Sequence, residues 1–174
     1  MKKVIAAISV LGLVGCASTG GGKTFQLTSQ FDANEVSWSE GKGTATISGQ
    51  SFVQTRGGQP RTCAGRPVNL VPVSAYAEER IRILYGNTYQ GYNSAFTGVK
   101  AKFVPDVFEF RSTIRNATCD AQGNFEFSGI PAGDYFVISS ITWVVDNPFI
   151  PQGGTMMKKV SIAEGESTRA ILTP

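Results

Sequence analysis

Few residues in this chain have side chains that could do chemistry. Its 174 residues include three cysteines and thirteen acidic residues but no histidine. The lack of imidazole excludes Ser-His-Asp and Cys-His catalytic arrangements. Glu78 and Glu79 are adjacent, and on a helix their side chains would point about 100° apart, which makes a poor pair of catalytic carboxylates. We therefore expect a protein that is not an enzyme, although a hydrolase of an unrecognised kind remains an alternative.

Cys16 is the residue with the clearest predicted chemistry. Lys2 and Lys3 give the chain a positive start, Val4 to Val14 is almost wholly apolar, and Gly15 precedes the cysteine. An apolar run of about 11 residues is too short to span a bilayer as a helix, and this arrangement is typical of an export signal. The segment resembles the lipobox of bacterial lipoproteins, which implies cleavage before Cys16 and acylation of that residue. An ordinary cleaved signal and a buried N-terminal strand are the alternatives.

The lipoprotein resemblance implies where the protein resides. Its acyl chains, of the palmitate type, would hold it on a membrane of the bacterial cell envelope, since several chains bind stably where one binds marginally. Ala17 after the cysteine implies the outer membrane, with the folded part facing the periplasm. We expect a signal peptide at 1–15, the lipidated cysteine with a flexible tether and an N-terminal extension at 16–42, and one domain at 43–174.

Cys63 and Cys119 are the two cysteines that remain once Cys16 is assigned to lipid. An exported protein meets an oxidising compartment, so a disulfide between them is the default prediction. A metal site or a reactive thiol is the alternative, but zinc would need carboxylates to complete its ligands. We interpret both cysteines as structural and expect no metal or other cofactor.

The charge of the chain restricts its partners. Removing Lys2 and Lys3 with the signal lowers the formal net charge from +3 to +1. A nearly neutral chain offers no broad basic face for nucleic acid or anionic lipid. We therefore expect no nucleic-acid partner.

The elements that position these residues are mostly strands. Low charge and many Gly, Ser, Thr and aromatic residues favour β-structure. Phe108, Phe110, Ser112 and Ile114 alternate with polar residues, which predicts a strand with one solvated face. The stretch 134–145 is apolar on both sides, as expected of a central strand. With these two, strand patterns occupy residues 44–53, 67–73, 108–115, 124–128, 134–145, 157–162 and 168–172. We therefore predict an all-β fold, a seven-stranded β-sandwich.

Two turns specify part of the topology. Asp120 to Gly123 and Ile130 to Tyr135 both have turn composition, and together they read Asp-x-x-Gly-x-Phe-x-Phe-x-x-Ile-Pro-x-Gly-x-Tyr. This hairpin, with Gly65 to Leu70 as a second strand, resembles the carboxypeptidase regulatory-like domains. The resemblance implies a transthyretin-like (prealbumin-like) Greek-key sandwich that serves structure or binding.

The stretch 74–107 departs from that resemblance, because it is far longer than the usual connection after the second strand. Residues 75–84 read as one short helix, with Ser74 as its cap and Gly86 at its end. Four aromatic residues follow among Gly, Asn, Gln and Ser: Tyr85, Tyr89, Tyr92 and Phe96. Such a composition is common in recognition surfaces, while the alternative is that these rings cover a sheet edge.

These observations predict a lipid-anchored envelope protein that acts as a non-catalytic binding or scaffolding module. Its expected partner is another envelope protein, docked through the insertion or a sandwich edge. The alternative is a glycan or peptidoglycan bound by the insertion's aromatic residues, since flat aromatic faces suit sugar rings. Trp143 is interpreted as a packing residue or a loop cap.

Overall fold

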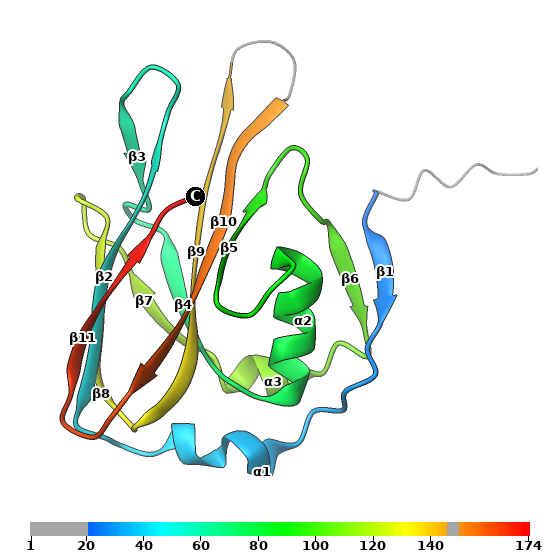
Figure 1. Ribbon diagram of the computed structural model, residues 1–174, viewed down its shortest axis with the longest axis vertical. Coiled ribbons are helices and arrows are strands. Elements are labelled where there is room, and N and C mark those ends of the chain that lie inside the picture. Colours follow the sequence, from blue (N-terminus) through cyan, green and yellow to red (C-terminus); the bar gives the residue numbers. More distant parts are fainter. Residues whose placement is uncertain (1–20, 146–149) are drawn as a thin grey trace, which may run out of the picture.

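The computed structural model describes residues 21–145 and 150–174 (Figure 1). Two β-sheets pack face to face, which confirms the predicted all-β sandwich. The described residues form eleven strands rather than the predicted seven, and three α-helices and a 3-10 helix rather than one short helix. The predicted signal peptide and Cys16 lie outside the described residues. Within the described part, no helix is both long and apolar enough to cross a membrane.

The larger sheet has five strands, each antiparallel to its neighbours. Its order is β5 (Gln90–Ser94), β10 (Ile150–Ile162), β9 (Gly133–Val145), β4 (Pro67–Pro72) and β7 (Arg115–Thr118). The two central strands β9 and β10 pair along thirteen residues, from Gly133 opposite Ile162 to Val145 opposite Ile150. Their pairing is the longest in this sheet.

The second sheet is built around one strand, β2 (Ala45–Gln54). On one side β2 pairs in parallel with β11 (Ser167–Leu172). On its other side, the first half pairs with β8 (Asn124–Ile130) and the second half with β3 (Pro60–Thr62), both antiparallel. The side chains of β2 alternate strictly between buried and partly exposed, as expected of a sheet with one buried face.

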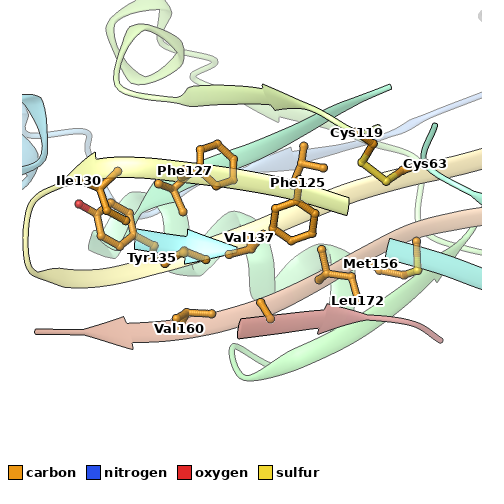
Figure 2. Close-up of a cluster of buried hydrophobic side chains, with 14 of the residues drawn as sticks. Cys63, Cys119, Phe125, Phe127, Ile130, Tyr135, Val137, Met156, Val160 and Leu172 are labelled. Atoms are coloured by element: carbon orange, nitrogen blue, oxygen red, sulfur yellow. A yellow bond between two sulfur atoms is a disulfide. The ribbon is translucent and has the colours of Figure 1, made fainter. Parts of the chain in front are cut away.

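The main core lies between the two sheets (Figure 2). The larger sheet contributes residues such as Leu70, Val137 and Met156, and the second sheet contributes residues such as Phe127 and Leu172. All five are no more than 5% exposed. Burial of this apolar surface holds the two sheets together.

A second apolar cluster covers the outer face of the larger sheet. Val71, Phe136 and Met157 point away from the main core and pack against α2 (Ala75–Tyr85) and α3 (Phe108–Ser112). The prediction that 134–145 is apolar on both sides is therefore confirmed, because β9 has a packed layer on each face. The predicted helix is also confirmed: Ser74 Oγ accepts a hydrogen bond from the N–H of Ala77, and Gly86 adopts the left-handed conformation after the last turn.

The predicted strand at 108–115 is wrong. Residues 108–112 form the helix α3, and strand β7 begins only at Arg115. The alternation of Phe108 and Phe110 suggested a strand, but Phe108 is 76% exposed whereas Phe110 is buried. The residues that pack inward are Val107, Phe110 and Ile114, whose spacing of three and four is that of a helix. The insertion therefore extends to about residue 114.

The N-terminal extension packs against the rest of the fold from residue 23 onward. Strand β1 (Lys23–Gln26) pairs in parallel with β6 (Ala101–Val104) of the insertion. Helix α1 (Ala33–Val36) and the 3-10 helix Ser37–Glu40 follow. Trp38 then contacts Tyr135, with ring centroids 5.2 Å apart. Residues 23–40 thus contribute to both cores.

The carboxylate of Glu79 attaches this extension to α2. It accepts hydrogen bonds from the backbone N–H groups of Thr28 and Ser29 and from the Thr28 hydroxyl, at 2.7–3.1 Å. The backbone donor of Thr28 contributes most to lowering the pKa of Glu79, from its usual 4.5 to about 2. The group is therefore ionised throughout the neutral range and acts as an acceptor for this turn.

The depressed pKa predicts how stability depends on pH. The Glu79 carboxylate stabilises the fold above pH 4.5, and this contribution is lost as the pH falls toward 2. Glu79→Gln should lower the melting temperature at neutral pH and reduce the further loss between about pH 5 and pH 2, relative to the unmodified chain. Thermal unfolding across this range measures both effects. Glu126→Gln, at an exposed glutamate of β8, is the control; an equal change in that variant would contradict the assignment.

Candidate functional site

An open cleft of about 1130 Å³ lies at one end of the sandwich. Its walls come from the β2–β3 hairpin, from β5 with the loop after it, and from the described part of the β9–β10 hairpin. These hairpins project side by side at the top of Figure 1. The lining residues used below are Thr55, Arg56, Gln59, Arg61, Tyr92, Phe96, Trp143, Gln152 and Gly153. This volume is slightly larger than the usual range for small-molecule sites, about 300–1,000 Å³.

Two adjacent glycines of β10 make room for two aromatic rings of the cleft. A Cβ atom on Gly153 would lie 2.6 Å from the Trp143 ring and 2.0 Å from the carbonyl oxygen of Ile141. A Cβ atom on Gly154 would lie 2.8 Å from the Tyr92 ring. Gly153 also has a φ of +77°, which L side chains rarely adopt. The glycine pair therefore permits both rings to pack directly on the strand.

Tyr92 is held in place by its hydroxyl group. This group donates a 2.6 Å hydrogen bond to the carbonyl oxygen of Gly153. Burial raises the pKa of the Tyr92 phenol above its usual value of 10, so the group is protonated and donates at neutral pH. The side chain is nevertheless 37% exposed. Tyr92 thus presents an anchored aromatic surface at the cleft.

Phe96 lies on a short loop that is fixed by two polar side chains. Ser94 Oγ accepts from the N–H groups of Phe96 and Thr97, both at 3.2 Å. Asn93 bonds both backbone groups of Val99, at 2.7 and 2.9 Å. Phe96 is 57% exposed although its loop is well bonded. An exposed aromatic ring on a fixed loop is suited to binding a flat apolar face.

Trp143 supports an arginine rather than offering a free face on that side. The Arg61 guanidinium group lies over the Trp143 ring, 4.9 Å from its centroid. Such a cation–π contact orients the guanidinium group while its N–H groups stay available. Arg61 therefore adds an oriented positive charge to the cleft.

A disulfide fixes the base of the β2–β3 hairpin. Cys63 and Cys119 form the predicted bond, with their Cα atoms 5.7 Å apart. Cys63 lies two residues after Arg61, and its N–H donates to the Ser51 carbonyl oxygen of β2 at 3.2 Å. Figure 2 shows the bond at one end of the main core. The hairpin therefore emerges from a covalently fixed point.

The structure separates the aromatic residues that the sequence singled out. Tyr92 and Phe96 meet in the cleft. Tyr85 instead packs against the second apolar cluster, as the packing alternative expected. Tyr89 is 77% exposed but lies outside the cleft lining. One short segment therefore carries both packed and exposed aromatic residues.

Sequence reasoning missed the other half of the cleft. Trp143 was interpreted only as a packing residue or a loop cap, and no role was assigned to Arg56 or Arg61. Trp143 does pack against the main core, but it also lines the cleft. The usable signal was the Gly153-Gly154 pair inside a strand, because glycine there often marks a close approach of other groups.

The two candidate carboxylates of α2 are engaged in structural contacts. Glu79 binds the turn at Thr28, and Glu78 lies 3.6 Å from the ammonium group of Lys159. Lys159 also pairs with Asp134 at 3.1 Å. None of these acidic residues lines the cleft. The arrangement therefore has the form of a binding surface with aromatic and basic groups.

Comparison with known proteins gives a structural relative. No family model matches the chain, and no curated protein is similar to it at a significant level. The fold is similar to the crystal structure of a candidate carbohydrate binding protein from Pseudomonas aeruginosa, with a TM-score of 0.67 and 25% sequence identity. The likeness covers 84% of this chain and 99% of that chain. The shared architecture therefore includes nearly the whole of that protein.

Because the Trp143 ring packs on Gly153, adding a single methyl group at this glycine should have a large effect on stability. Gly153→Ala should destabilise the protein by more than the roughly 1–2 kcal/mol expected for a left-handed residue alone, because the methyl group meets the Ile141 carbonyl oxygen and Trp143. Gly65→Ala is the matched control, since Gly65 has a φ of +69° with no atom within 4 Å of the added Cβ. Denaturant unfolding of both variants measures the difference. An equal loss of stability in both would contradict the proposed packing.

Proposed function

We propose that the protein is a lipid-anchored, non-catalytic binding module of the bacterial cell envelope, and that its ligand is a saccharide held in the cleft. The observation that carries this proposal is that two exposed rings line one open cleft: Tyr92, anchored by its hydroxyl group, and Phe96, on a loop held by hydrogen bonds. The C–H face of a sugar ring is apolar and packs on the flat face of an aromatic side chain.

The polar lining of the cleft supports the same ligand class. The side chains of Thr55, Gln59 and Gln152 lie among the lining residues. Hydroxyl and amide groups donate and accept hydrogen bonds, as do the hydroxyl groups of a sugar. An aromatic surface bordered by such groups is a common composition for a small-molecule site.

The structural relative gives independent support. The Pseudomonas aeruginosa protein is itself described as a candidate carbohydrate binding protein, and it shares this fold over 99% of its length. A protein partner, which the sequence also predicts, stays a prediction. So does membership of the carboxypeptidase regulatory-like domains.

The cleft aromatics provide the test of ligand class. The full chain, purified in detergent, should bind members of a panel of neutral and acidic oligosaccharides in isothermal titration calorimetry. Tyr92→Ala and Phe96→Ala should each weaken this binding at least about tenfold, as expected for central aromatic contacts. Tyr89→Ala is the matched control, because Tyr89 is an exposed aromatic residue outside the cleft. Binding of no saccharide, together with capture of a specific protein by cross-linking, would favour the protein partner instead.

The lipid anchor is tested at Cys16, which lies outside the described residues. Mass spectrometry of the protein from the membrane fraction should find an N-terminal cysteine bearing acyl chains and no residues 1–15. Cys16→Ser should remove the acyl mass and release the protein from the membrane fraction. An unmodified N-terminus that still begins at Met1 would contradict the proposal.

A further inference from the structure

The described lining of the cleft carries charge of one sign. Arg56 and Arg61 line it from the β2–β3 hairpin, and its described lining contains no Asp or Glu. The ion pairs formed among residues 21–145 and 150–174 involve Arg80, Arg111 and Lys159 instead. Among the described residues, neither guanidinium group of the hairpin forms an ion pair with a carboxylate.

Local contacts hold the part of the hairpin that carries the two arginines. Arg61 is on β3, stacked on Trp143 at 4.9 Å and two residues from the disulfide at Cys63. Arg56 lies in the turn, whose ends are joined by a 3.0 Å hydrogen bond from the N–H of Thr55 to the carbonyl oxygen of Gln59. A guanidinium group that is already oriented loses less conformational freedom when it binds a planar carboxylate through two parallel hydrogen bonds.

We propose that the cleft selects an acidic saccharide, whose carboxylate binds Arg61 and Arg56 while its ring packs on Tyr92 and Phe96. This inference rests on the proposed function, because it names the ligand class of the same cleft. The aromatic side provides affinity for sugar rings in general, and the basic side provides the preference for acidic ones. Such a carboxylate can come from the uronic acids of a polysaccharide or from the peptide stems of peptidoglycan fragments.

The test compares an acidic saccharide with its neutral ester. The full chain in detergent is titrated with a galacturonate oligosaccharide and with its methyl ester, and soluble muropeptides and their methyl esters are titrated in a separate arm. We expect one acidic ligand to bind at least about tenfold more tightly than its neutral ester, with an affinity that falls as salt is added. The class of acidic ligand that binds more tightly identifies the source of the carboxylate.

Substitutions assign that preference to the arginines. Arg56→Gln combined with Arg61→Gln should weaken binding of the acidic ligand at least about tenfold and leave binding of the ester within about twofold. Arg82→Gln, at an exposed arginine of α2, removes one positive charge away from the cleft and should change neither.

Two results would overturn the inference in distinguishable ways. Equal binding of acid and ester would retain a saccharide site but remove its selection for acid. Binding of neither form, of no muropeptide and of no member of the oligosaccharide panel would remove the saccharide function as well.

Discussion

The five-stranded sheet must be covered on both faces, and the rest of the structure follows from this constraint. Its central strand β9 carries Tyr135 and Val137 on one side and Phe136 on the other, all no more than 1% exposed. The second sheet covers one face, and the helices of the insertion cover the other. Without those helices the outer face would be an exposed apolar patch, which soluble domains rarely tolerate.

The insertion that covers the sheet also forms one side of the cleft. After α2 the chain returns as β5, which pairs with β10 and places Tyr92 beside Gly154. The loop that follows β5 then carries Phe96 to the same place. The same excursion of the chain thus carries Tyr85, partly buried against the second apolar cluster, and Phe96, exposed at the cleft.

The sequence predicts a helix or strand correctly where a local pattern defines it, and incorrectly where contacts with distant residues define it. Helix α2 has a cap, a charged first turn and a terminal glycine, so its bounds could be predicted closely. At 108–115 the alternation of two phenylalanines was misleading, since the buried set was spaced for a helix that packs on a distant sheet. The sequence does not reveal the short strands β1, β3, β5 and β6. Each is a strand because it pairs with another strand, which for β1, β5 and β6 lies far away in the chain and for β3 is the other strand of its hairpin. The aromatic composition of their segment singles out Tyr92 and Phe96 in the sequence. Arg61 and Trp143 are far apart in the chain, and they contact each other only because the fold places β3 near β9.

The disulfide has one more consequence. Strands β4 and β7 pair antiparallel, from Pro67 opposite Thr118 to Leu70 opposite Arg115, so everything between them forms one excursion. The Cys63–Cys119 bond closes the neck of that excursion just outside the paired strands. With the neck closed, lengthening the enclosed segment costs little chain entropy, roughly 0.6 kcal/mol per doubling for a flexible loop. The segment between β4 and β7 can therefore change in length while the sandwich is kept, provided that the altered segment still shields Phe136 and Met157 from water.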